Sequence, residues 1–300
     1  MKKIIIGLAV AAFAFVAQAQ ALTVATGDAK AGSTYSRMFR EFAAQCSAVV
    51  PLQEKETNGG AANMALVTGN QVAMAIVPTD MLFFTKATDP SKVENIRTLV
   101  TLHPEELHFV ARADVKKEGG FMGIGAKEKS YNTVGDLQGR PVGAVGGSVL
   151  SARVFSQYSK LNLNVIEFPS NDTLKAALLE GKIDSALVVG GAPHGLVASL
   201  DQRFRLLDVN EDVRKSVAAV YKPAKLSYSN LNQAGVNSVA TQAQLVTRVW
   251  RGEDMQNKLK ALRACFAKNV PNIQDTVGSH PKWQDVKVND KGNWTYYEFN

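Results

Sequence analysis

The sequence predicts an α/β protein of two lobes, each a mostly parallel sheet flanked by helices, with a cleft between them and two hinge crossings. Three observations predict this fold class. Short apolar strand-like segments alternate with helical segments along most of the chain, as in sheets with parallel strands. The 300 residues suffice for two moderate cores. Glycine-bearing turns recur where a strand-like segment passes into a helix, and the loops at strand carboxyl ends line the clefts of such folds.

The N-terminus has the pattern of a secretory signal peptide. Lys2 and Lys3 precede an apolar run from Ile4 to Val16, and Ala17-Gln18-Ala19 has the small-x-small pattern of a cleavage site. We expect residues 1–19 to be removed, with cleavage as late as residue 21 also compatible, and the mature chain to be exported to the periplasm. A retained anchor is the weaker hypothesis, because the apolar run is too short to span a membrane.

Charge excludes one class of partner. The formal net charge is +7, and loss of the leader lowers it to +5 because the leader carries two lysines and no acid. No dense basic run with interleaved aromatic residues occurs, so nucleic acid is not expected as a partner. The mild basic excess fits a small anionic ligand or a negatively charged envelope partner, and it equally fits plain solubility.

Two cysteines, Cys46 and Cys265, stand far apart in the chain. Their count and spacing exclude a CxxC redox motif and a zinc knuckle. In an oxidising exported compartment the pair is a candidate disulfide that would join an early helix to a late one. Two buried free thiols are equally compatible, and the sequence does not separate the two.

The first half of the chain alternates strand and helix. Helical periodicity predicts a helix over Ser33–Ala48 and a shorter one over Ala61–Asn70, ended by Gly69. The expected strands are Leu22–Thr26, Val49–Thr57, Gln71–Val77, Ile96–Leu102 and Leu107–Asp114.

The alternation resumes in the second half, after Thr133. The expected strands are Arg140–Val145, Asn164–Phe168, Ile183–Val189, Phe204–Val209 and Ser238–Arg248. The expected helices are Ser148–Leu161, Asp172–Lys182, one that starts at Pro193, Asn210–Tyr221 and Glu253–Val270.

Three segments depart from the alternation. Val115–Asn132 is rich in glycine and lysine and is expected to be a flexible loop or a β-excursion, while Lys222–Asn237 is expected to be irregular. Trp283–Phe299 alternates about two turn-like dipeptides and predicts a terminal hairpin. We assign residues 22–111 plus 238–300 to the first lobe and residues 112–237 to the second, with hinges near Arg112 and Val239.

The glycine-bearing turns form the candidate binding site. Helix starts at Gly32-Ser33-Thr34, Asn58-Gly59-Gly60, Gly146-Gly147-Ser148 and Gly190–His194 would offer backbone N–H donors and positive dipole ends to one cleft. This arrangement suits a small organic anion. A single turn of this kind is more often only structural.

Five stretches resemble the TAXI-type solute receptors of tripartite ATP-independent periplasmic (TRAP) transporters. They are TGDAKAGSTY, ETNGGAANMALVTGNQVAMAIVPTD, TLHPEELHFVARAD, VGDLQGRPVGAVGGS and LLEGKIDSALVVGGAPHGLV, in the family's order. The resemblance covers essentially the whole mature chain and implies a type II periplasmic-binding-protein fold. It also implies a receptor that captures a small organic anion or amino acid, glutamate-like or dicarboxylate-like, and delivers it to a TRAP membrane permease. We expect no cofactor and no metal.

The resemblance implies thirteen ligand contacts: Gly32, Ser33, Thr34, Tyr35, Asn58, Gly59, Asp80, Gly147, Ser148, Val149, Ala192, Pro193 and His194. One stretch departs from the family, which has Gly-Ser-Gly-Thr where this chain has Gly146-Gly147-Ser148-Val149. The two hydroxyl positions become Gly147 and Val149, and this bears on the identity of the solute.

Several residues have competing explanations. Asp80 is expected either to orient a ligand amine or to cap the helix that begins at Thr79, with capping favoured. Arg112 and Arg153 are candidate carboxylate partners. His103, Glu105, Glu106 and His108 crowd one strand-turn, and we expect a surface hairpin there rather than a metal site.

An enzyme is the weaker hypothesis. The segment GGSVL lacks the second flanking glycine of a GxSxG nucleophile elbow, and neither cysteine has a neighbouring histidine in sequence. Three further hypotheses compete with a TRAP receptor: the binding protein of an ABC importer, a secreted α/β hydrolase or transferase, and an adhesive envelope protein.

Overall fold

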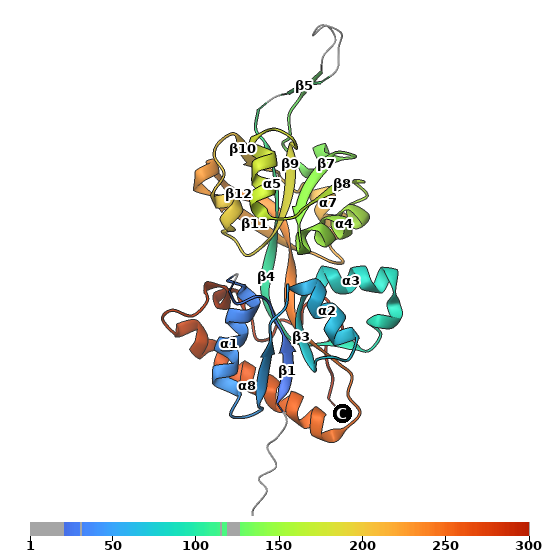
Figure 1. Cartoon of the computed structure of the whole chain (residues 1–300), viewed down its shortest axis with the longest axis vertical. Coiled ribbons are helices and arrows are strands. Elements are labelled where there is room, and N and C mark those ends of the chain that lie inside the picture. Colours follow the sequence, from blue (N-terminus) through green and yellow to red (C-terminus); the bar gives the residue numbers. More distant parts are fainter. Residues whose placement is uncertain (1–20, 31, 115, 119–126, 300) are drawn as a thin grey trace, which may run out of the picture.

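Two long strands, β4 (Ile96–Arg112) and β12 (Gln233–Arg248), run through the whole molecule and carry a lobe at each end (Figure 1). The computed structural model describes residues 21–30, 32–114, 116–118 and 127–299. Ten strands form one mixed sheet with the main order β2-β1-β3-β12-β4-β9-β7-β8, while β10 and β11 pair with β4 and β12. The predicted α/β class is confirmed, and the parallel strands of the two lobes are joined by antiparallel ones.

Three parallel strands form the sheet of the first lobe, and one of them, β3, pairs antiparallel with β12. These strands are β2 (Leu52–Lys55), β1 (Leu22–Ala25) and β3 (Met74–Pro78). Helices α1 (Thr34–Cys46) and α8 (Glu253–Asp275) contribute to one buried apolar cluster, and α2 (Gly60–Thr68) and α3 (Thr79–Thr88) to another. Two short 3-10 turns, η1 (Pro90–Lys92) and η4 (Pro281–Asp285), complete this lobe.

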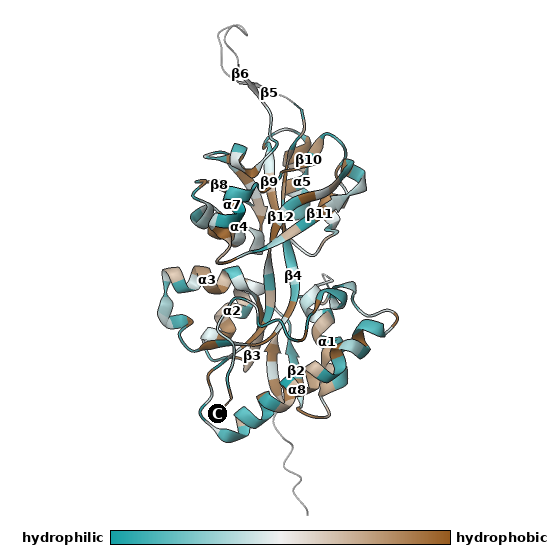
Figure 2. Ribbon diagram, turned by 180° about the vertical axis from the view of Figure 1, so that it is seen from behind, coloured by the Kyte–Doolittle hydropathy of each residue, from teal (hydrophilic) through white to brown (hydrophobic). Residues whose placement is uncertain are grey.

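The second lobe repeats the plan. Its parallel strands are β8 (Asn164–Phe168), β7 (Pro141–Val145) and β9 (Ser185–Gly190), and β10 (Phe204–Leu206) and β11 (Lys222–Tyr228) add antiparallel pairs. Helices α4 (Gly147–Ser159) and α7 (Glu211–Val217) pack into one apolar cluster, α5 (Asn171–Leu179) and α6 (Gly195–Ala198) into another. Short 3-10 turns are η2 (Val134–Leu137) and η3 (Ser229–Leu231). Figure 2 shows apolar residues in strands such as β3 and β9, and polar residues on helices such as α7 and on β4 between the lobes.

The sequence analysis was wrong about three segments. The two strands expected at Ile96–Leu102 and Leu107–Asp114 are one strand, because the polar residues between them continue the pairing with β12, as in Glu106 opposite Ala240. The segment expected to be irregular forms the β11–β12 hairpin. The expected terminal hairpin does not form in the described tail, which instead bridges to β4 between Thr98 and Tyr296.

The chain crosses between the lobes earlier on β4 than we expected. Leu107, Phe109 and Ala111 pack in a core cluster of the second lobe, although they precede the predicted boundary at residue 112. On β12, Val239 packs in the same cluster, while Ala243 packs in the first lobe. The crossings therefore lie near residues 103–106 and 240–242. An extended strand carries no loop at such a boundary, so the sequence offered no composition signal there.

A disulfide joins the two long helices of the first lobe. Cys46 at the end of α1 and Cys265 in α8 are bonded, with the sulfur atoms 1.98 Å apart. Of the two possibilities that the sequence left open, the structure contains the bridge, and it links an early helix to a late one.

Two predictions concern residues that are described only in part or not at all. Within Val115–Asn132, β5 (Lys116–Glu118) and β6 (Lys127–Lys129) form an antiparallel pair. Residues 119–126 and the predicted signal peptide, residues 1–19, lie outside the described residues. Among the helices that the structure describes, none combines the length and apolar character needed to cross a bilayer.

Candidate functional site

A cavity of about 310 Å³ lies where the two lobes meet. This volume is at the lower end of the range of small-molecule pockets, roughly 300–1,000 Å³. The lining residues come from the starts of helices α1 to α6, from the ends of strands and from the crossing strand β4: Ser33, Thr34, Tyr35, Asn58, Gly59, Gly60, Pro78, Met81, Glu105, Val145, Gly147, Ser148, Ser151, Asn171, Val188, Val189 and His194.

Eight of the thirteen residues expected to contact a ligand line this cavity: Ser33, Thr34, Tyr35, Asn58, Gly59, Gly147, Ser148 and His194. They come together because the starts of α1 and α2 in the first lobe face the start of α4 and the turn after β9 in the second. These residues stand at or beside strand-to-helix turns, and their role as ligand contacts stays a prediction.

The remaining five expected residues do not line the cavity. Gly32 is exposed one residue before the lining segment, and Val149 is buried within α4. Asp80 is fully buried behind the wall. Ala192 and Pro193 precede the N-cap of α6, which is His194, so Pro193 is not the first helical residue as expected. The candidate carboxylate partners also lie elsewhere, since Arg112 pairs with Asp114 and Arg153 borders a separate surface pocket.

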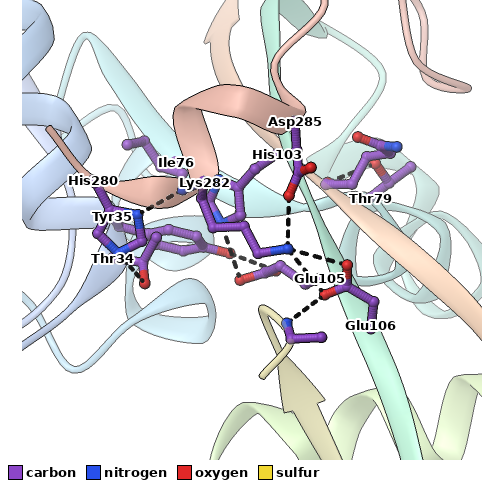
Figure 3. Close-up of polar contacts among 12 residues, drawn as sticks. Thr34, Tyr35, Ile76, Thr79, His103, Glu105, Glu106, His280, Lys282 and Asp285 are labelled. Carbon is purple, nitrogen blue, oxygen red and sulfur yellow. Dashed lines mark hydrogen bonds and ion pairs between the residues drawn. The ribbon is translucent and has the colours of Figure 1, made fainter. Parts of the chain in front are cut away.

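Glu105 is a lining residue that the sequence analysis did not select for a ligand role. It lies on β4, and its Oε2 accepts a hydrogen bond of 2.9 Å from the Tyr35 hydroxyl (Figure 3). Burial, more than any other cause, raises the pKa of Glu105 to about 7. Among the described lining residues it is the one acidic side chain, and no lysine or arginine lines the cavity.

The segment around Glu105 is not the surface hairpin that we expected. His103 and His108 are 1% and 0% exposed, because β4 lies in the middle of the sheet. Burial lowers the pKa of His103 to about 3 and that of His108 to about 4, so both imidazoles are neutral at physiological pH. Within the described part of the chain, no group of three or more His, Cys, Asp or Glu residues could hold a metal ion.

The second lobe contributes hydrogen-bond donors to the cavity. Ser148 Oγ accepts the Val189 N–H at 3.0 Å, which leaves the hydroxyl proton free to be donated into the cavity. His194 Nδ1 accepts the Leu196 N–H at 3.3 Å, so the ring proton is on Nε2. Burial lowers the pKa of His194, and the ring is therefore a neutral donor.

Beside the cavity, a network of ion pairs and hydrogen bonds joins η4, β4 and the turn after β9. Lys282 Nζ, on η4 of the first lobe, lies 3.1 Å from Glu106 Oε1 and 2.8 Å from Asp285 Oδ2. Glu106 Oε2 accepts the Ala192 N–H of the second lobe at 2.8 Å. The tail of the chain thus contacts the turn after β9. A Cβ on Gly191 would lie 2.3 Å from Lys282 Cε, so a larger residue there would require the lysine side chain to shift.

Asp80 is not the N-cap residue of α3, and it does not line the cavity. The N-cap of α3 is Pro78. The Asp80 carboxylate contacts the second lobe, where its Oδ2 accepts a hydrogen bond of 3.2 Å from the Tyr221 hydroxyl. Its Oδ1 has no hydrogen-bond partner of standard geometry among the described residues, although Ser151 lies close enough to lower the pKa. Burial is the largest influence, and it raises the pKa of Asp80 above its usual value.

The substitution Asp80→Asn is expected to stabilise the protein at high pH. An acid whose folded pKa is raised contributes stability at low pH that is lost as pH rises through the folded pKa, and the neutral amide removes that loss. We expect the gain to be larger at pH 8 than near pH 4, which is close to the ordinary pKa of an aspartate. Thermal unfolding at both pH values measures it, with the exposed Asp212→Asn in α7 as the control. Equal effects of Asp80→Asn at both pH values would contradict the prediction.

Comparison with known proteins adds two findings. The model of the NMT1-like family matches residues 27–260. Among solved structures, Tv2483 bound to L-arginine has a TM-score of 0.50 at 14% identity, with 90% of this chain and 94% of that chain covered. The GluR0 ligand-binding core with L-glutamate has a TM-score of 0.48 at 12% identity, covering 84% and 95%. Arginine-bound, truncated ArgBP from T. maritima has 0.46 at 12%, covering 82% and 95%. The likeness to Tv2483 supports the two-lobed fold of periplasmic binding proteins.

Proposed function

Because the chain belongs to the NMT1-like family and has the two-lobed fold of periplasmic binding proteins, we propose that it is an extracytoplasmic solute receptor. The observation that carries this proposal is the cavity between the lobes, where helix starts from both lobes and the Glu105 carboxylate meet. A solute there would contact both lobes at once. Its binding energy would then favour the closed arrangement, with bending at the crossings of β4 and β12.

The polar groups of the cavity favour an amino acid over a dicarboxylate. The starts of α1, α2 and α4 offer backbone N–H groups, and Ser148 and His194 add donors, so one carboxylate is accommodated. A second carboxylate would face Glu105 with no lysine or arginine among the described lining residues. Of the glutamate-like and dicarboxylate-like solutes expected from the sequence, the amino-acid class therefore fits better. L-arginine, which is bound in the Tv2483 structure, belongs to that class.

We infer from the sequence resemblance that the receptor delivers its solute to a TRAP-type permease after export to the periplasm. An ABC importer is the second candidate, and the fold is compatible with both. Reconstitution of transport with each type of permease distinguishes them.

Binding without chemistry is the proposal for the cavity itself. The lining serines Ser33, Ser148 and Ser151 have no hydrogen bond to a histidine among the described residues. A serine nucleophile requires such a base within hydrogen-bond reach, so the arrangement supports capture of a solute rather than its conversion.

The substitution Gly147→Trp tests the cavity. A Cβ on Gly147 meets no atom within 4 Å, so an indole can enter the cavity without a clash at the backbone. Gly59 is less suitable, because its φ of +100° would strain any larger residue. At a concentration of about 100 Kd, a bound amino acid or dicarboxylate stabilises the wild type by about 2.7 kcal/mol. We expect Gly147→Trp to lose this stabilisation in thermal-shift and calorimetric assays.

The control for this test is Gly252→Trp. Gly252 is the exposed N-cap of α8, and a Cβ there also meets no atom within 4 Å, but it lies outside the cavity. Full ligand-induced stabilisation of Gly147→Trp would show that the solute binds elsewhere. Failure of the wild type to respond to any amino acid or dicarboxylate would count against the receptor function.

A further inference from the structure

Among the described residues around Glu105, no positive charge is free to pair with it. The side chain is 15% exposed. Its Oε2 accepts the Tyr35 hydroxyl, and its Oε1 accepts no hydrogen bond among the described residues. His103 Nε2 lies 3.9 Å from Oε1, and that imidazole is neutral.

Lys282, the one lysine near Glu105 in the described part of the chain, is paired with other carboxylates. Lys282 Nζ lies within hydrogen-bond distance of Glu106 and of Asp285, and its side chain is 10% exposed. Glu106 is therefore compensated, whereas its neighbour on β4 is not. A carboxylate removed from water is costly unless a cation or several hydrogen bonds compensate it. Glu105 has one hydrogen bond and an oxygen without a partner, and it lines a cavity.

We propose that Glu105 is the specificity-determining residue of the cavity and receives a cationic nitrogen of the solute, an ammonium or a guanidinium. This inference rests on the proposed function and names the class of solute: small molecules that carry both a cationic nitrogen and a carboxylate. A bound cation would supply to Oε1 the charge-assisted partner that the protein itself does not provide.

The start of α4, on another wall of the cavity, would bind the carboxylate of the solute. The carboxylate of the same solute would lie against the start of α4, where the first N–H groups of a helix have no intrahelical partner. Ser148 and His194, which also line the cavity, are donors on that side. The carboxylate would then contact the second lobe, and the cationic nitrogen would contact β4 where it crosses between the lobes. A solute that lacked either group would leave Glu105 or the start of α4 without its partner.

The charge of Glu105 gives the binding a characteristic pH dependence. Burial raises the pKa of Glu105 to about 7, and a bound cation lowers it, so binding near pH 7 releases protons. Affinity for a cationic solute is expected to rise between pH 6 and pH 8. The titratable or charged groups facing Glu105 from the surrounding elements are Tyr35, Asp80, His103, Glu106, His194, His280 and Lys282.

The test uses pairs of probes that differ in one group. They are L-glutamate with 2-oxoglutarate, L-leucine with 4-methyl-2-oxopentanoate, and L-arginine with agmatine. Titration calorimetry of the full mature protein in buffers of different ionisation enthalpy measures affinity and proton release together. We expect at least one amino acid to bind the wild type with proton release, more tightly than its partner that lacks the amine or the carboxylate.

The variant Glu105→Gln keeps the shape of the side chain and removes its charge. We expect it to bind that amino acid about 30-fold or more weakly and without proton release. Glu167→Gln, an exposed glutamate on β8, is the matched control and should bind as the wild type does. The wild-type proton release requires no variant, so the inference stays testable if Glu105→Gln does not fold.

The outcomes separate this inference from the proposed function. If an amine-free acid binds the wild type as tightly as its amino-acid partner, and Glu105→Gln leaves both affinities unchanged, the receptor function stands and the role of Glu105 is refuted. Binding of the amino acid without proton release between pH 6 and pH 8 also refutes it. If no probe binds, the proposed function fails, and the inference fails with it.

Discussion

Replacing both Cys46 and Cys265 with serine is expected to lower the free energy of unfolding by about 3–5 kcal/mol. The bridge joins residues separated by 219 positions, so it closes a loop of most of the chain and removes much conformational freedom from the unfolded state. Both residues are buried where α1 packs against α8. Serine hydroxyls at those positions would lose the covalent link and add polar groups to an apolar cluster.

Chemical denaturation of the double variant measures this loss. Because α1 and α8 belong to the first lobe, the effect should fall on the transition in which that lobe unfolds. Mass spectrometry of the unreduced wild type provides the control, since a bridged chain is lighter than the reduced chain by two hydrogen atoms. An unchanged mass on reduction, or a double variant as stable as the wild type, would show that the bridge does not form or does not stabilise the protein.

The second large effect is expected from Trp283→Ala, at about 3–5 kcal/mol. Trp283 is the largest fully buried side chain among the described residues, and its ring packs near Phe266 of α8. Its indole N–H donates a hydrogen bond of 2.6 Å to Glu41 of α1. Truncation leaves a cavity and removes this donor from Glu41. It also loosens η4, which carries Lys282, so we expect weaker solute binding together with lower stability.

Trp250→Ala is the matched control for this prediction. Trp250 is only partly buried, and its indole N–H donates to Thr247 within the same segment. Denaturant unfolding of the two variants should therefore show a clearly smaller loss for Trp250→Ala. Equal losses would indicate that burial of Trp283 is not what attaches the tail to the first lobe.

Local features of the sequence were sufficient to predict some of the turns that border the cavity. Gly59 and Gly147 stand at strand-to-helix turns, and such turns can be recognised from a few neighbouring residues. The α/β class was predicted for the same reason, since each strand and helix has its own periodicity. Lys222–Asn237 was wrongly expected to be irregular. It contains β11 and the start of β12, and a bulge between Leu226 and Tyr228 interrupts their pairing.

The character of the site could not be predicted in this way. The mild positive charge of the chain suggested an anionic solute, but the charged side chain that lines the cavity is Glu105. The expectation of a surface hairpin at His103–His108 failed because burial of β4 depends on strands from distant parts of the chain. Lys282 pairs with the Glu106 carboxylate, although the two residues are 176 positions apart in the sequence, and no local pattern predicts such a pair.

The sequence by itself determined the class of fold, the alternation of strands and helices and the glycine turns at the helix starts, because each of these depends on the conformational preferences of a few adjacent residues. Only the tertiary structure decided which carboxylates near the cavity are paired with a lysine and which one is not. The cost of a buried charge depends on the groups around it in space, and in this protein those groups come from α1, β4, η4 and the turn after β9.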